Sequence, residues 1–245
     1  MQNVATDMTT SVAQRPPRAA GRTATVKSWN LTDKLLTAGI VAGPIYVAIG
    51  ALEMLLRPGF DPRRYALSVI ANGDWGWVHI VMMATTGLLA IAGAIGMRRA
   101  IRGQRAGTWG PLLIGLYGLG VTCAAFFTAD PTLGFPPGTP ADAHTVSWHG
   151  NLHMLFGSTG FLGLIAASLV FGRRFASLGQ RGLATFSILT GLYFFAAILT
   201  GILAGSAQDD LNILALTVFA FTGAVVLGWT WISTVSAMLK RSLKA

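Results

Sequence analysis

The chain has 245 residues, of which 53% are hydrophobic and only 11% are charged, and its formal net charge is +9. Soluble domains carry about 25% charged residues, so this composition excludes an ordinary soluble globular protein and indicates a polytopic membrane protein. The basic residues are divided among four separate segments, which argues against a nucleic-acid-binding surface.

Six stretches of 18 to 30 residues contain no Asp, Glu, Lys or Arg. A helix needs about 20 predominantly apolar residues to cross a bilayer, so each stretch has room for one spanning helix. The stretches are continuously apolar, which favours helices over the alternating strands of a barrel. We therefore predict an all-α, six-helix transmembrane domain over residues 34–239, with helices at about 35–56, 77–97, 109–128, 147–171, 183–205 and 212–239.

The segment before the first helix, residues 1–33, is rich in Thr, Arg and Pro and has no apolar signal-peptide core. We predict that it forms a disordered basic tail on the cytoplasmic side. The first helix carries Gly39 and Gly43 one turn apart, a spacing that lets another helix approach closely. The connection that follows includes Ser68 and is longer than a tight turn.

Further along the chain, His79 enters the second helix near its first turn. Cys123 is the single cysteine and lies within the third helix, so neither a disulfide nor a thiolate metal site is expected. The third and fourth helices are joined by residues 129–144, which contain four prolines, two acids and no basic residue. External loops of this length are often lids or binding loops, so this one is a candidate for function.

Lys and Arg are distributed unevenly between the two ends of these helices. Fifteen of the 18 precede the first helix, follow the last, or lie in the second and fourth connections. Basic segments remain in the cytoplasm, so we predict a plasma-membrane protein with both termini cytoplasmic. Seven of the nine acids and all four histidines then fall at the outer ends of the helices, where we expect the polar chemistry to lie.

The start of the fourth helix is the main candidate for a functional site. His149 and His153 are four residues apart, so they lie one turn apart on the same helical face. Such a pair can bind a divalent metal such as zinc when other side chains complete the coordination shell. We predict His79 as a third metal ligand, Asp130 as a fourth ligand or general base, and Ser68 as a further catalytic candidate.

Other interpretations of these residues remain open. Histidines close to a membrane interface can simply bond loop carbonyls, and Glu53 at the end of the first helix adds a further polar group at the same level. Alternatively, His79 and His153 lie on different helices at similar depth, which is the arrangement that one b-type haem requires. No histidine lies at the cytoplasmic side, so a second haem is excluded.

The preferred hypothesis is a metal-dependent membrane enzyme that acts on a lipid or other interfacial substrate. The non-enzymatic alternative is a permease or an accessory membrane subunit, in which glycine-mediated helix packing matters more than the histidines. The expected partners are the lipid bilayer and a lipid or small-molecule ligand. The sequence leaves open which of these functions applies, and whether the chain is an enzyme.

Several short motifs together point to a known family. They are R-R-Y-A-L-S-V-I-A-N-G (63–73), F-F-T-A-D-P (126–131), G-F-P-P-G (134–138) and H-G-N-L-H (149–153). With them the chain resembles, over roughly residues 35–238, the six-helix prokaryotic membrane proteins grouped as domain of unknown function 998. The resemblance implies the same six-helix topology and directs attention to Ser68, Asp130, His149 and His153, but it implies no particular reaction.

Overall fold

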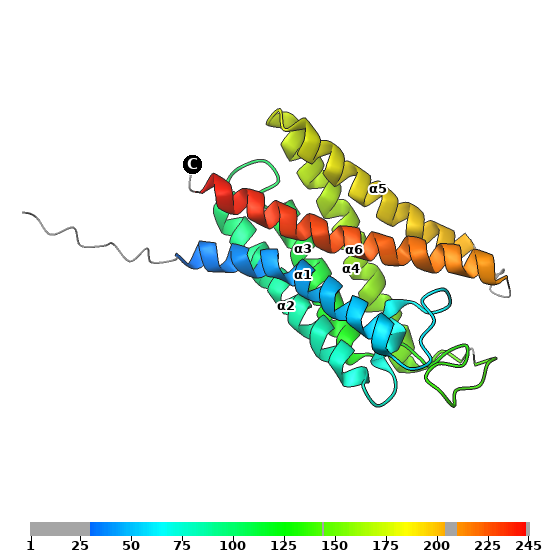
Figure 1. Ribbon diagram of the computed structural model, residues 1–245. Helices are drawn as coiled ribbons and strands as arrows, with labels where there is room; N and C mark the ends of the chain where they lie inside the picture. The colour runs from blue at the N-terminus through cyan, green and yellow to red at the C-terminus, as the bar shows by residue number, and fades with distance from the viewer. Residues whose placement is uncertain (1–29, 144, 204–209, 244–245) are drawn as a thin grey trace, which may run out of the picture.

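Residues 30–143, 145–203 and 210–243 are described in the computed structural model of the protein (Figure 1). Within these ranges the chain forms six long helices and one short 3-10 helix, with no β-strand. Each long helix is long and apolar enough to cross a membrane. The predicted all-α, six-helix membrane fold is thereby confirmed. Most of the predicted tail, residues 1–29, lies outside the described ranges.

The helices are α1 (Leu31–Leu56), α2 (Gly76–Ala100), α3 (Trp109–Phe126), α4 (Trp148–Ser177), α5 (Arg181–Leu203) and α6 (Leu211–Ser242), with the 3-10 helix η1 (Leu67–Ala71) between α1 and α2. α1 begins earlier than predicted because the Asn30 side chain caps it, accepting a 2.8 Å hydrogen bond from the Asp33 N–H. α4 continues past residue 171 and stops where Gly179 adopts a left-handed conformation, with φ 73°. The predicted end of the fifth helix, residues 204 and 205, lies outside the described residues.

The six helices form a closed bundle. Each helix packs against the next one in the chain, and α6 packs against α1 to complete the ring. The start of α1 and the end of α6 lie at the same end of the bundle (Figure 1). The Thr37 hydroxyl accepts a hydrogen bond from Lys240 Nζ at this end, and Arg99 at the end of α2 bonds Thr32. The chain therefore enters and leaves the bundle on one side.

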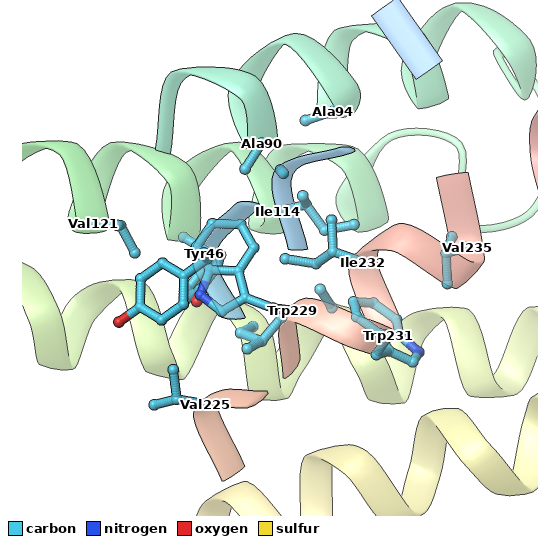
Figure 2. Close-up of a cluster of buried hydrophobic side chains, with 14 of the residues drawn as sticks. Tyr46, Ala90, Ala94, Ile114, Val121, Val225, Trp229, Trp231, Ile232 and Val235 are labelled. Carbon is cyan, nitrogen blue, oxygen red and sulfur yellow. The ribbon is translucent and has the colours of Figure 1, made fainter. Parts of the chain in front are cut away.

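Close helix contacts rely on glycine, as the Gly39 and Gly43 spacing predicts. A Cβ built on Gly93 of α2 would lie 2.7 Å from the Gly39 Cα, and one built on Gly43 would lie 2.6 Å from the Trp229 carbonyl oxygen of α6. Trp229 is fully buried in the centre of the bundle, where it stacks on Tyr46 with a ring separation of 4.9 Å (Figure 2). Large aromatic side chains thus fill the interior, while glycines let the helix backbones approach.

The two long connections pack together over one end of the bundle. We call residues 57–75 and 127–143 the loop cap. Tyr65, Val69 and Phe135 form a small core of their own within it. The Tyr65 hydroxyl also donates a 2.9 Å hydrogen bond to the Leu133 carbonyl, joining the two connections. The loop cap is therefore a folded unit, and its position fixes the ends of the helices that carry the predicted site residues.

Candidate functional site

A buried acid–histidine pair joins α1 to α2 directly beneath the loop cap. Glu53 lies in the last turn of α1 and His79 in the first turn of α2. The His79 Nδ1 lies 2.7 Å from the Glu53 Oε2, and the exposed fractions of the two side chains are 0% and 10%. Burial of a lone ionisable group in this environment is unfavourable, so each side chain depends on the other for compensation.

The pair retains unused hydrogen-bonding capacity. Glu53 Oε1 and His79 Nε2 are both buried, and neither forms a hydrogen bond with the part of the chain that the structure describes. Most buried polar side-chain atoms in proteins do have a partner, and leaving one without a partner costs about 1–3 kcal/mol. Two such atoms on one interacting pair mark this position as a candidate site for a ligand or a proton.

A pocket with a volume of about 430 Å³ adjoins this pair. Its walls are mostly apolar, and it is lined by Ile49, Leu52, Glu53, Leu56, Arg57, Pro58, Trp75 and Val78. Leu52, Leu56 and Trp75 are exposed on the outside of the bundle. The pocket therefore lies at the side of the bundle, between α1 and the start of α2, on a surface available to lipid. Its volume lies within the usual range for small-molecule sites.

Arg57 supplies a cation to the wall of this pocket. It is the residue that caps the end of α1, and its Nη2 donates hydrogen bonds to the carbonyls of Ile70 and Asn72. Partial burial lowers the pKa of Arg57 from its ordinary value, while the nearby Glu53 and Asp74 carboxylates oppose this effect. The side chain therefore anchors the loop cap and places a positive charge one helical turn beyond Glu53.

Asp130 occupies a different position, at the junction between α3 and α4. Its Oδ2 accepts a 2.8 Å hydrogen bond from the Ser147 N–H, and its Oδ1 accepts one of 2.6 Å from the Ser147 hydroxyl. Ser147 in turn caps α4 by accepting from the Gly150 N–H. A Cβ on Gly150 would lie 2.0 Å from Asp130 Oδ2, so only glycine leaves space for this carboxylate. In the described residues, Asp130 thus binds the start of α4.

The two histidines of α4 have different surroundings. The half-buried His153 Nδ1 lies 2.9 Å from the Phe127 carbonyl and 3.0 Å from the Ala124 carbonyl, so this nitrogen donates to the end of α3. His149 is exposed and its ring lies 3.5 Å from that of Trp148. The contacts of His153 match the interpretation in which an interfacial histidine bonds loop carbonyls. His144 lies outside the described residues.

The predicted site residues are therefore distributed between two hydrogen-bonded groups. One is the Glu53–His79 pair, and the other joins Asp130 to the start of α4. Ser68 lies half-buried in η1, and its hydroxyl forms no hydrogen bond with the described residues. No group of three or more His, Cys, Asp or Glu side chains in the described ranges is arranged to hold a metal ion.

Two features of the candidate site were not predicted from the sequence. The first is the role of Arg57, although a lone basic residue four positions after Glu53 was a usable signal. The second is the pocket itself, which depends on how α1 and α2 are rotated and has no signal in the sequence. Ser147 was also missed as the cap of α4, although a serine before a helical segment is a common capping residue.

The fold defines the chain as a multi-pass helical membrane protein, with a buried polar pair beneath a loop cap. A family model described as "Protein of unknown function (DUF998)" matches residues 40–238, and the chain belongs to this family. The resemblance seen in the sequence motifs is thereby confirmed. No curated protein and no solved structure matches the chain.

Proposed function

We propose that the protein binds a lipid-like amphiphile in the pocket between α1 and α2, and that the Glu53–His79 pair holds the polar part of this ligand. One observation carries the proposal: a buried pair with two unused hydrogen-bonding atoms adjoins an apolar pocket on the side of a membrane-spanning bundle. An apolar pocket with a few polar groups is the usual composition of a small-molecule site.

The position of the pocket favours a ligand that arrives through the bilayer. Leu52 and Leu56 of α1 are exposed at its edge, on a surface that faces lipid when α1 spans the membrane. Trp75 lies at the same edge and close to Trp77, with a ring separation of 6.4 Å. Tryptophan is enriched at the boundary between hydrocarbon and headgroups, so this edge lies at the depth where the polar part of an amphiphile resides.

Binding is supported more directly than catalysis. A histidine oriented by a carboxylate is the usual arrangement of a general base, and His79 has this arrangement with Glu53. A nucleophilic mechanism also requires a hydroxyl or thiol within hydrogen-bond reach of the base. No hydrogen bond joins His79 to Ser68 in the described part of the chain.

Metal-dependent catalysis is a separate proposal, with His149, His153 and His79 as ligands and Asp130 as a fourth ligand or general base. The arrangement of the described residues supports it less directly than amphiphile binding, because Asp130 and His153 already bond Ser147 and the end of α3. Elemental analysis of the purified protein tests it. Stoichiometric zinc that disappears when His149 and His153 are both replaced by Ala would support metal binding.

The orientation in the membrane is also a proposal. The end of the bundle opposite the loop cap carries most of the basic residues of the described chain, including Arg98 and Arg99 of α2 and Lys240 and Arg241 of α6. Basic segments are retained in the cytoplasm. We therefore assign the loop cap and the pocket to the outer side of the plasma membrane.

A matched pair of variants tests amphiphile binding. Leu52→Trp fills the pocket, whereas Leu55→Trp makes the same change on the same helix at a position outside the pocket lining. We expect wild type and Leu55→Trp, reconstituted in nanodiscs, to bind tritiated N-dodecanoylglycine saturably, and Leu52→Trp to lose most of this binding. Equal binding by both variants, or no saturable binding by the wild type, would refute the proposal.

A further inference from the structure

Glu53 and Arg57 are the two charged side chains that line the pocket, Glu53 in the last turn of α1 and Arg57 at the residue that caps this helix. Ile49 and Leu52 are apolar, Glu53 follows with a hydrogen-bond acceptor, and Arg57 supplies a cation between the apolar Leu56 and Pro58. We infer that the ligand carries a hydrogen-bond donor next to its apolar chain and an anionic group beyond that donor. This inference rests on the amphiphile binding proposed above.

The spacing of these side chains follows from helix geometry. Ile49, Glu53 and Arg57 are separated by four residues each, and a helix rises about 6 Å over four residues. Residues four apart also lie on nearly the same helical face. The three side chains therefore form a row from the membrane interior toward the loop cap. An apolar chain, a donor and an anion spaced over about 12 Å match this row.

The donor requirement comes from Glu53. An ionised carboxylate only accepts hydrogen bonds, and one of its two oxygens already bonds His79. The other oxygen, Oε1, is buried and has no partner in the described residues. A ligand hydroxyl, amide N–H or ammonium supplies the missing donor. A group that only accepts, such as an ester, leaves this oxygen without a partner.

The anion requirement comes from Arg57. Only its Nη2 bonds the carbonyls of Ile70 and Asn72, and no hydrogen bond joins Nε or Nη1 to a described residue. The guanidinium is positively charged at physiological pH and has a planar fork of donors suited to carboxylate and phosphate. Its bonds to the loop cap hold it in place at the pocket wall. Asp74 is the other acid close to Arg57.

This order distinguishes the ligand from bulk membrane lipid. In zwitterionic phospholipids the phosphate lies next to the chains and the ammonium lies farther out, which is the reverse of the order along α1. N-acyl amino acids and monoacylglycerol phosphates have the matching order, because an amide N–H or a hydroxyl lies between the chain and the acidic group. The shared chemistry is an apolar chain, a donor and then an anion.

Matched ligands test the inference on the intact protein in nanodiscs, by displacement of tritiated N-dodecanoylglycine. O-dodecanoylglycolate replaces the amide N–H by an ester oxygen, and N-dodecanoylethanolamine replaces the carboxylate by a hydroxyl. We expect each to bind on the order of 10-fold more weakly than N-dodecanoylglycine, because each lacks one hydrogen bond to a charged group. A parallel measurement with 1-dodecanoylglycerol 3-phosphate distinguishes a phosphate from a carboxylate as the preferred anion.

Variants assign each preference to its residue. Arg57→Gln is expected to abolish the preference for N-dodecanoylglycine over N-dodecanoylethanolamine, and Arg57→Lys is expected to retain part of it. Glu53→Gln is expected to reduce the preference for N-dodecanoylglycine over O-dodecanoylglycolate. Leu52→Trp and Leu55→Trp, measured with the same ligands, report pocket occupancy independently. If all ligands bind the wild type equally and Leu52→Trp abolishes their binding, the inferred order is wrong and amphiphile binding stands. If Leu52→Trp binds as well as Leu55→Trp, both proposals fail.

Discussion

Removal of the histidine from the buried pair is expected to destabilise the protein strongly. His79→Leu leaves the Glu53 carboxylate buried without its 2.7 Å partner, and only 10% of that side chain is exposed. Removing one partner of a buried acid–base pair costs about 3–5 kcal/mol when it leaves a carboxylate without compensation. For a chain of this size, 1 kcal/mol shifts the melting temperature by roughly 2–4 °C, so we expect a decrease of roughly 6–20 °C.

Two further variants test the same pair: Glu53→Leu alone, and Glu53→Leu combined with His79→Leu. Glu53→Leu leaves an imidazole without its hydrogen-bond partner but no buried carboxylate, so its cost is expected to be lower, about 1–3 kcal/mol. The double variant replaces both polar groups by apolar ones and should be more stable than His79→Leu alone. His149→Leu makes the same change at an exposed histidine and should alter stability by less than about 0.5 kcal/mol.

The half-buried Cys123 of α3 provides the assay. A maleimide dye that becomes fluorescent on reaction with this thiol reports unfolding as the purified protein is heated in detergent. Equal melting temperatures for His79→Leu and His149→Leu would refute the reasoning, because the buried pair would then contribute no more than an exposed histidine.

Three further predictions concern packing, capping and topology. Gly93→Ala should destabilise the protein by about 1–3 kcal/mol in the same melting assay, because the new Cβ would lie 2.7 Å from the α1 backbone. Gly115→Ala is the control: its Cβ would lie 3.8 Å from the nearest atom, so the change should be neutral or stabilising by up to about 1 kcal/mol. The reverse ranking would contradict the glycine contacts. Asp130→Asn should cost about 1–3 kcal/mol, since the amide nitrogen cannot accept from the start of α4, and an unchanged melting temperature would contradict the capping role. The topology is tested in a cysteine-free background with a membrane-impermeant maleimide applied to intact cells. This reagent should label Ala141→Cys in the loop cap but not Gln180→Cys between α4 and α5. The opposite labelling pattern would show that the proposed orientation is wrong.

The helices were predictable because lipid imposes a strong constraint on sequence. A spanning segment must be apolar over about 20 residues and must satisfy its own backbone, so uncharged stretches reveal the helices directly. The helix ends were less predictable, because they depend on caps rather than on the bilayer. α4, for example, extends beyond Arg174. The buried Arg174 guanidinium donates hydrogen bonds to the Arg105 carbonyl and to the Gln104 side chain, and no local sequence pattern specifies these contacts.

For the candidate site, the sequence indicated which end of the bundle its residues share but not which of them are in contact. The sequence placed Glu53, His79 and Asp130 at one end of the bundle, and the structure has them there. Which of them meet depends on the rotation of each helix about its axis, which is set by packing across the bundle. His149 and His153 show this limit well: they share a helical face, but only His153 lies deep enough to reach the end of α3.

The contact between the first and last helices has a consequence for the order of assembly. Gly39 and Gly43 of α1 pack against Ser236, Ser233 and Trp229 of α6, so α1 cannot complete its interface until α6 has been synthesised. Until then this side of α1 faces lipid, whose acyl chains are as apolar as the side chains that later pack there. α6 is the last of the six helices to be synthesised, so truncation within α6 should leave five inserted helices that cannot form the closed bundle.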